Sequence, residues 1–426
     1  MVLNRSVLVF LLAAAGCGQS LFDGNGGGSS GDAAPSATCP ATCLADAGGD
    51  FDGSPGGRTG RWRYLEDPGS RTWQVMTTSG ATAIGSNPAN VIASCAGDAS
   101  APACALLPGA LLMSAADGAA PDPAIEFTAD AAQVVSVTVR IAVPAGVADQ
   151  PIRLYRGSRE DLLWKGTATA GMVLEQELTL DALPGDRLLL ALVSTAAGAD
   201  RVGVQMFVSA TGAAFPASCQ LGLSFATSTI NAVTVDNLCG ADFTGNDDNG
   251  MWAPLTEAGP YAEQGTALAL SAGQYLRGAD VLSHDGDLTY QLWMRTDAVD
   301  PIYMGWALSD YDLDVGGGLG IGVYDDNGSL RLESGTCTSP DPLAFAASTA
   351  SWQNGGWHFV RVVHAEGKVT LCVDGARASS FDRAAGALVS TFPPYVGKNV
   401  RWLPAGAFYD GAIDDLRVFD GALPCD

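Results

Sequence analysis

The chain has 426 residues, of which 22 are basic and 46 acidic, so its formal net charge at pH 7 is −24. Because so acidic a chain repels phosphate, the charge argues against binding along a nucleic-acid backbone and against direct docking on an anionic lipid surface. The ten cysteines indicate an oxidising compartment outside the cytoplasm.

The N-terminus has the features of an export signal. Residues 1–16 combine one positive charge with a short apolar run that ends in small residues. This run is too short to span a bilayer of about 30 Å as a helix, and it fits a signal peptide. The segment Ala14-Ala15-Gly16-Cys17 resembles a bacterial lipobox, which implies that Cys17 is lipidated. We therefore expect an exported lipoprotein of the cell envelope or cell surface, with the outer membrane as its place; an ordinary secretion signal with an incidental cysteine is the alternative.

Residues 17–57 are predicted to form a flexible, disordered tether. Glycine, serine and aspartate dominate this segment, so it has too little apolar surface to offset the loss of chain entropy on folding. As a coil of roughly 40 residues, its ends would lie about 35 Å apart. The tether would hold the folded part of the protein away from the membrane.

Residues 58–216 are predicted to form a first β-sandwich. Apolar and small or polar residues alternate from Val135 to Val143 and from Leu174 to Leu180. A period of two predicts strands with one buried face, and turns rich in glycine, proline and aspartate separate such strands in sandwiches. Cys95 and Cys104 bracket a short polar loop and are predicted to close it with a disulfide.

Residues 217–426 carry the most informative pattern. Trp357-His358-Phe359-Val360 opens a strand, the segment Val369 to Gly375 closes the hairpin that follows, and Gly411 to Phe419 supplies a last strand. In this order and spacing, the segments resemble a laminin-G-like jelly roll of the pentraxin/concanavalin type. The resemblance implies a second β-sandwich that acts as a binding module. The predicted fold class is therefore all-β, with two jelly-roll-like sandwiches in tandem after the tether.

Two disulfides are predicted in this second unit. By strand parity, Cys337 and Cys372 both face outward on nearby strands, which suits a cross-strand bridge. The resemblance implies a second pair, Cys219 with Cys425, because these residues flank the first and last strands, which pair antiparallel in the family. Three cysteines have no predicted partner: Cys39, Cys43 and Cys239.

Calcium is the ion that the pattern favours. Asp414 shares strand parity with Leu416 and Val418 and should point inward, where a carboxylate needs a cation or several N–H donors. In relatives of this fold, an acidic residue in the last strand helps to bind structural calcium together with a loop after the first strand. The resemblance therefore implies Asp414 with oxygen ligands from the corresponding loop. The loop candidates are Asp247, Asp248 and Asn249. In the alternative, Asp414 caps backbone donors and the loop is a solvated turn.

Sugar binding commonly pairs an aromatic face with a few well-placed polar groups. Six aromatic residues outside clear inward parity are candidates for ligand contact: Trp402, Tyr409, Tyr303, Trp306, Tyr311 and Trp352. The alternative is that these side chains fill the core or cover strand ends, as most aromatic residues in sandwiches do.

No catalytic residues are predicted. The chain lacks the Glu-x-Asp-x-x-Glu string of glucanases of this broad fold. Its Gly-x-Ser-x-Gly string, at 27–31, lies in the predicted tether and not on a strained strand-to-helix turn, and its histidines fit framework positions. We expect a non-enzymatic, lipid-anchored surface protein that recognises an extracellular carbohydrate or protein, with optional help from structural calcium. Its membrane contact would be the lipid anchor alone, with no nucleic-acid partner. The alternatives are a cell-envelope or matrix scaffold without a ligand pocket, and a hydrolase with an unrecognised site.

Overall fold

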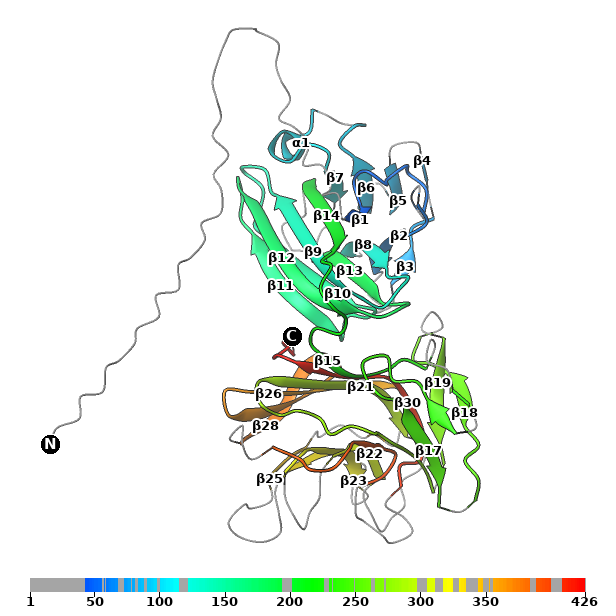
Figure 1. Ribbon diagram of the computed structural model, residues 1–426. Coiled ribbons are helices and arrows are strands. Elements are labelled where there is room, and N and C mark those ends of the chain that lie inside the picture. Colours follow the sequence, from blue (N-terminus) through cyan, green and yellow to red (C-terminus); the bar gives the residue numbers. More distant parts are fainter. Residues whose placement is uncertain are drawn as a thin grey trace, which may run out of the picture. The chain divides into compact units, whose positions relative to one another are not determined.

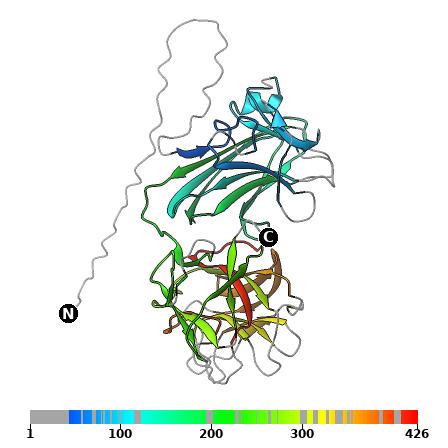
Figure 2. The same cartoon turned by 90° about the vertical axis from the view of Figure 1, so that its right-hand side faces the viewer.

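The computed structural model describes residues 43–425 with gaps, the longest of which are 115–121, 194–200, 297–304, 311–316, 335–343 and 400–407. The described residues form β-strands and one short helix, α1 (Pro102–Leu106). Antiparallel sheets pack face to face as two sandwiches, so the predicted fold class is confirmed. Figures 1 and 2 show the two layers of each sandwich from two directions. Within the described residues, no helix has the length and apolar character needed to cross a membrane.

The first sandwich pairs an eight-stranded sheet with a six-stranded sheet. The eight-stranded sheet has the order β12 (Val173–Ala182), β9 (Gln133–Ala142), β14 (Val202–Ala210), β7 (Leu111–Ser114), β6 (Asn90–Ser94), β5 (Ala83–Asn87) and β4 (Ser79–Gly80), with β1 (Cys43–Asp46) paired to β14. The six-stranded sheet has the order β11 (Leu162–Ala168), β10 (Gln150–Arg156), β13 (Arg187–Leu192), β8 (Asp122–Thr128), β2 (Trp62–Asp67) and β3 (Gln74–Val75). The alternating valines of β9 are buried between the sheets, as their period of two predicted.

The first sandwich begins earlier than predicted, so the expected tether at 17–57 is corrected at its C-terminal end. Strand β1 pairs with β14, and Phe51 is buried in the first core. Asp46 accepts backbone hydrogen bonds of 3.0 Å from the two glycines that follow Ala47. Asp50 accepts one of 3.0 Å from the indole N–H of Trp62. Here the aspartates fold the chain through local hydrogen bonds instead of only keeping it hydrated.

The second sandwich consists of two eight-stranded sheets. The first, here called the β30 sheet, has the order β18 (Leu255–Ala258), β19 (Thr266–Leu270), β30 (Gly411–Asp420), β21 (Leu288–Thr296), β26 (His358–Ala365), β27 (Lys368–Val373) and β28 (Ala376–Asp382), with β15 (Cys219–Leu223) paired to β30. The second, the β29 sheet, has the order β16 (Thr234–Val235), β17 (Phe243–Asp247), β20 (Gln274–Arg277), β29 (Tyr395–Val396), β22 (Gly305–Ser309), β23 (Gly320–Tyr324), β24 (Ser329–Ser334) and β25 (Ala344–Ala347). The antiparallel pairing of β15 with β30 is the one that the family resemblance implied.

The first sandwich covers the outer face of the β30 sheet. On this face Arg361 is only 1% exposed, and its guanidinium donates to the carboxylate of Asp161 and, at 2.9 Å, to the carbonyl oxygen of Leu162. Gln291, the cross-strand neighbour of Arg361, donates to the same carboxylate at 2.9 Å. A carboxylate of the first sandwich is therefore held by two side chains of the second, and the described residues belong to one compact unit.

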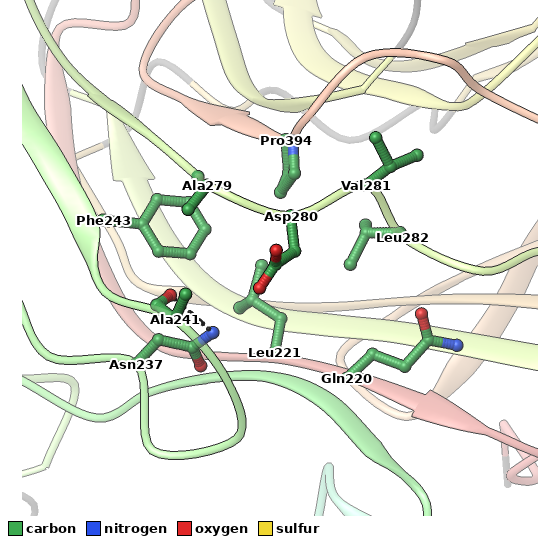
Figure 3. Close-up of a pocket in the computed structure, with 11 residues that line it drawn as sticks. Gln220, Leu221, Asn237, Ala241, Phe243, Ala279, Asp280, Val281, Leu282 and Pro394 are labelled. Atoms are coloured by element: carbon green, nitrogen blue, oxygen red, sulfur yellow. Dashed lines mark hydrogen bonds between the residues drawn. The ribbon is translucent and has the colours of Figure 1, made fainter.

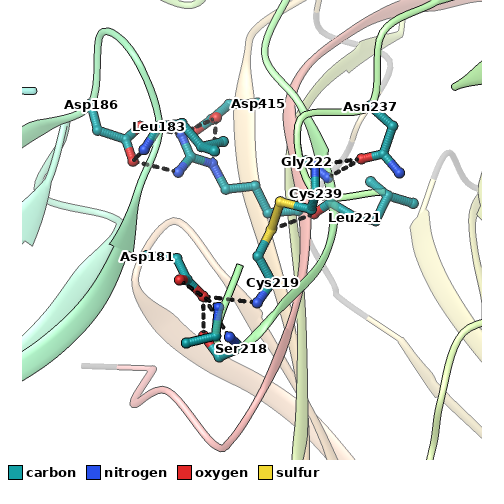
Figure 4. The surroundings of a disulfide bond; sticks show 12 residues. Asp181, Leu183, Asp186, Ser218, Cys219, Leu221, Gly222, Asn237, Cys239 and Asp415 are labelled. Atoms are coloured by element: carbon teal, nitrogen blue, oxygen red, sulfur yellow. Dashed lines mark hydrogen bonds and ion pairs between the residues drawn. A yellow bond between two sulfur atoms is a disulfide. The ribbon is translucent and has the colours of Figure 1, made fainter. Parts of the chain in front are cut away.

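A second buried ion pair lies nearby. Arg417 of β30 donates to Asp186 of the first sandwich at 2.8 Å, and it also pairs with Asp415 at 2.6 Å. Burial acts to raise the pKa of Asp186, but the charge of Arg417 and its hydrogen bonds hold that pKa below its ordinary value. Asp186 is therefore ionised at neutral pH although it is buried. Figure 4 shows Asp186 and Asp415, the two carboxylate partners of Arg417, near the segment that joins the sandwiches.

The connecting segment is fixed by a single carboxylate. Asp181 of β12 accepts hydrogen bonds from the backbone N–H groups of Ala217, Ser218 and Cys219 at 2.9, 2.6 and 2.9 Å. The hydroxyl of Ser218 donates a further bond to it at 2.7 Å. Charge-assisted hydrogen bonds of this kind are about twice as strong as neutral ones. The link between the sandwiches is therefore a tied segment, as Figure 4 shows.

The structure confirms one predicted disulfide and corrects another. Cys95 is joined to Cys104, the pair expected from the short loop between them. Cys372 is joined to Cys425, whereas Cys337, its predicted partner, lies outside the described residues. Cys372 does share the outer face of the sheet with Arg361, but that face is covered and Cys372 is only 2% exposed.

The other predicted pair, Cys219 with Cys425, is also corrected, because Cys219 is joined to Cys239. After β15 the chain turns back, and the backbone N–H of Leu238 donates to the carbonyl oxygen of Gly222 at 2.9 Å. This turn brings Cys239 beside Cys219, a local closure that strand pairing alone did not indicate. Cys43 is also disulfide-bonded.

The buried Arg361–Asp161 pair generates a stability prediction. Arg361→Ala should lower the free energy of unfolding by about 3–5 kcal/mol, because it leaves a buried carboxylate without its cation. Urea unfolding of the whole protein measures this loss. The double variant Arg361→Met with Asp161→Leu should lose less, since neither member of this pair is then left as an unpaired buried charge.

The exposed pair Arg140–Glu175 offers a matched control. Arg140→Ala should cost no more than about 1 kcal/mol, because water screens a surface ion pair. Equal losses in Arg361→Ala and Arg140→Ala would contradict the assignment of Arg361 as a buried link.

Candidate functional site

The outer face of the β29 sheet carries partly exposed aromatic side chains. Leu276 of β20 and Val396 of β29 are fully buried in the core between the sheets. Because successive side chains of a strand point to opposite faces, their neighbours Tyr275 and Tyr395 project outward. Both tyrosines are partly exposed.

Three rings lie side by side on this face. The centroids of Tyr275 and Tyr395 are 5.9 Å apart with an interplanar angle of 28°. Phe408, which bridges to Lys398 and Trp306, adds a third ring at 6.2 Å and 31° from Tyr275. These distances are those of favourable aromatic pairs. We call Tyr275, Tyr395 and Phe408 the aromatic row.

Charged groups stand along the aromatic row. The Nζ atom of Lys398 lies 4.4 Å from the ring centroid of Tyr275 and 5.1 Å from that of Phe408, and it pairs with Asp248 at 2.8 Å. Burial raises the pKa of the Tyr275 phenol, and the nearby Asp248 carboxylate raises it further. The phenol therefore stays protonated at neutral pH, and it is hydrogen-bonded to Asp248.

The other end of the row is also polar. The guanidinium of Arg277, the exposed last residue of β20, lies 5.9 Å from the ring centroid of Tyr395. On the neighbouring strand β17, Thr244 stands opposite Arg277, and Asn246 stands opposite Tyr275. The face thus combines aromatic rings with hydroxyl, amide and guanidinium groups. Such a combination suits a ligand that has both an apolar face and directional polar groups.

A small cavity lies next to this end of the row. Its volume is about 60 Å³, and Gly278 and Pro394, which line it, adjoin Arg277 and Tyr395 in the chain. Figure 3 shows the carboxylate of Asp280 among the lining residues. This volume is far below the roughly 300–1,000 Å³ of ligand pockets and suits a few water molecules.

The polar lining of the cavity serves the framework. Asn237 accepts backbone hydrogen bonds from Gly222 and Cys239 at 2.9 and 3.1 Å. Gln220 exchanges two hydrogen bonds with the backbone of Ser283. Because these polar groups already bond to the loops around the cavity, we interpret the cavity as part of the loop structure and not as a ligand pocket.

Three of the aromatic residues predicted to contact ligand are buried, which corrects that interpretation. Trp306, Trp352 and Tyr409 are 6%, 1% and 1% exposed. The Trp306 ring packs on Gly320, where a side chain would clash with it. The Trp352 ring lies 4.3 Å from that of His358, and the Tyr409 hydroxyl donates to a backbone carbonyl at 2.7 Å. The other three lie outside the described residues: Trp402, Tyr303 and Tyr311.

Asp414 is 2% exposed, but it does not point into the core, so the predicted inward position is wrong. Its neighbour Ile413 belongs to the core, and Asp414 stands opposite Trp293, which shares the outer face with Gln291. The register shift between Gln291 and Trp293 and the φ of 45° at Asp415 mark an irregularity that reverses the parity between Asp414 and Leu416.

The Asp414 carboxylate accepts hydrogen bonds from the backbone N–H groups of Asp415, at 2.8 Å, and of Phe225. Burial raises its pKa to about 8, and the neighbouring Asp415 adds to the shift. Backbone donors of this kind were the alternative to a metal ion at this position.

The predicted calcium ligands are not brought together. Asp247 ends β17 in the β29 sheet, whereas Asp414 lies in β30 of the facing sheet, and Asp248 is paired with Lys398. Asn249 lies outside the described residues. Among the residues that are described, no group of three or more His, Cys, Asp or Glu side chains could hold a metal ion. Calcium binding therefore stays a prediction. Cys17 lies outside the described residues, so its lipidation also stays a prediction.

The histidines occupy framework positions. His284 lies 2.7 Å from the Tyr290 hydroxyl and 3.1 Å from the Asp310 carboxylate, and all three side chains are buried. His358 lies 2.9 Å from Asp374, whose carboxylate also accepts the backbone N–H of Phe359. Both contacts tie loops to strand ends.

Residues 270–425 match the family model described as the concanavalin A-like lectin/glucanases superfamily. The resemblance to a jelly roll of this type is therefore confirmed for the second sandwich. Comparison with curated proteins finds no match.

The chain is similar to several solved structures at low sequence identity. Domain 4 of AbnA, an extracellular arabinanase from Geobacillus stearothermophilus in complex with arabinotriose, is 20% identical, with a TM-score of 0.38; the match covers 49% of this chain and 94% of that one. The binding domain of botulinum neurotoxin serotype D is 12% identical, with a TM-score of 0.34, and the match covers 49% of each chain. A SAP-like pentraxin from Limulus polyphemus is 18% identical, with a TM-score of 0.29, over 35% of this chain and 71% of that one.

The burial of Asp414 generates a pH prediction. Its pKa of about 8 lies above the ordinary 3.8, so between these values the folded protein holds a proton that the unfolded chain releases. Stability should therefore fall as pH rises through this window, by up to about 1.4 kcal/mol per pH unit. Asp414→Asn should remove this slope. Urea unfolding at pH 5 to 8 in the presence of a chelator measures it.

Asp130→Asn is the control, because Asp130 is an exposed carboxylate. The free energy of unfolding of the Asp130→Asn variant should show the same pH dependence as that of the unmodified protein. An unchanged slope in Asp414→Asn would show that another group causes the dependence.

Proposed function

We propose that the protein recognises an extracellular glycan on the aromatic row of its second sandwich. The observation that carries this proposal is the set of three adjacent, partly exposed rings, of which Tyr275 and Tyr395 are stacked, with polar and charged groups at both ends. The match of residues 270–425 to a superfamily that includes lectins supports it.

The chemistry of the row suits a sugar. One face of a pyranose ring presents C–H groups and can pack on an aromatic ring, while its hydroxyls need directional partners. Tyr275 and Tyr395 supply the rings. Asn246 and Arg277 supply donors, and the amide oxygen of Asn246 and the phenol oxygen of Tyr275 supply acceptors. Because strands hold these groups, little ordering of the surface is required on binding, which favours affinity.

We propose binding without hydrolysis. Glycoside hydrolysis normally requires two carboxyl groups at a set separation on either side of the scissile bond. Among the described contacts of the row, Asp248 is the carboxylate, and it is paired with Lys398. A scaffold role without a ligand remains the main alternative, and a hydrolase with a site elsewhere is the other.

Lipidation of Cys17 would place this function at the cell envelope, anchored through the N-terminus. Calcium is proposed only as a stabilising ion near Asp414, separate from the aromatic row. The supporting observation is the buried carboxylate, for which a cation would offset the cost of ionisation. With one carboxylate, the remaining ligands would be backbone carbonyls and water.

The glycan proposal is tested by an array screen of the whole protein, followed by titration with the best ligand. Tyr275→Ala should weaken binding at least tenfold, because a central aromatic contact is commonly worth more than about 1.4 kcal/mol. Tyr275→Phe, the matched control, keeps the ring and should retain most of the affinity. Full affinity in both Tyr275→Ala and Tyr395→Ala would place the binding site elsewhere, and an empty array would favour the scaffold.

The calcium proposal has an independent test. An ion that binds only the folded state must raise the melting temperature. Calcium should therefore raise it relative to a chelator, and Asp414→Asn should abolish the difference. A melting temperature that is the same with calcium and with chelator would remove calcium from the proposal.

A further inference from the structure

We infer that the aromatic row selects an anionic sugar, whose carboxylate or sulfate group is held by Arg277. This inference rests on the proposed function and adds the ligand class. It starts from the position of Arg277 beside the ring of Tyr395, at the exposed end of β20.

Arg277 is an exposed arginine whose closest described neighbour on the aromatic row is a ring. The chain has 46 acidic against 22 basic residues, and several partly exposed arginines elsewhere pair with carboxylates. Examples are Arg61 with Asp130, at 2.7 Å, and Arg295 with Glu257, at 2.8 Å. Within the part of the chain that the structure describes, Arg277 has no such ion pair, and its neighbours are the Tyr395 ring and, across the strand pair, Thr244.

The two ends of the row therefore differ in available charge. Asp248 neutralises Lys398 at the Phe408 end, with an Nζ–carboxylate distance of 2.8 Å. At the other end, the guanidinium of Arg277 keeps its charge for an outside partner. A sugar whose ring packs on Tyr395 would bring its acidic substituent close to this guanidinium.

The guanidinium chemistry favours an oxyanion over a neutral hydroxyl. Its planar fork can donate two parallel N–H bonds to a carboxylate, and such charge-assisted pairs are stronger than neutral hydrogen bonds. The net charge of −24 opposes the approach of anions to the protein as a whole. Anionic selectivity would thus depend on this local contact, which makes it sensitive to a single side chain.

The test compares one sugar with and without its charge. Oligogalacturonate and its methyl ester share the same rings and differ in the carboxylate. The protein should bind the acid at least tenfold more tightly than the ester, as measured by calorimetric titration. In Arg277→Gln this ratio should fall to about one, and in Arg277→Lys it should be intermediate, because lysine keeps the charge but loses the fork.

Arg377→Gln is the matched control. Arg377 is an exposed arginine on β28 of the other sheet, so its replacement lowers the net charge equally and should leave the ratio unchanged. A parallel titration with a sulfated galactan and its desulfated form separates the two anions. An Arg277-dependent preference confined to the sulfated pair would support the inference with sulfate as the recognised group.

Two results would overturn the inference and leave the proposed function intact. One is equal binding of the charged and uncharged forms, with binding of both lost in Tyr395→Ala. The other is binding of only neutral glycans in the array, again lost in Tyr395→Ala. Failure of every glycan to bind would overturn the proposed function and, with it, this inference.

Discussion

The structure depends on the burial of two aspartates of the first sandwich against two arginines of the second. Asp161 meets Arg361, and Asp186 meets Arg417, on the outer face of a sheet that would otherwise face water. Burying a charge is unfavourable unless it is paired and hydrogen-bonded. The two ion pairs therefore fix how the sandwiches pack against each other. Asp181 fixes the segment that connects them through a hydrogen bond from the backbone N–H of Ser218.

This arrangement also determines where a ligand can bind on the second sandwich. One broad face of the jelly roll is occupied by the first sandwich, including the polar side chains that strand parity places outside the core. The aromatic row lies on the opposite sheet, where Tyr275 and Tyr395 remain partly exposed. Outward-facing side chains thus form the interface with the first sandwich on the β30 sheet, and they form the candidate binding surface on the β29 sheet.

The sequence predicted the fold well because local alternation reports which face of a strand is buried. It predicted the Cys95–Cys104 disulfide from the short loop between the two residues. It placed Asp414 on the wrong face, because the irregularity at Asp415 interrupts the alternation. It failed where a contact depends on distant segments: Cys372 was expected to be exposed, yet the first sandwich covers its face. Outward parity at Tyr275 and Arg277 was a usable signal for the aromatic row, but the approach of Phe408 and Lys398 follows from the topology and has no local signature.

The tied connection between the sandwiches has a mechanical consequence. Residues 216–219 are the covalent path for a pulling force between the first sandwich and the aromatic row. In this segment one carboxylate accepts hydrogen bonds from three successive N–H groups, and Cys219 is cross-linked to Cys239. The buried ion pairs lie in parallel with this connection, so they share the load. We expect this connection to resist bending between the two sandwiches. Under flow or shear, the aromatic row would therefore turn together with the first sandwich.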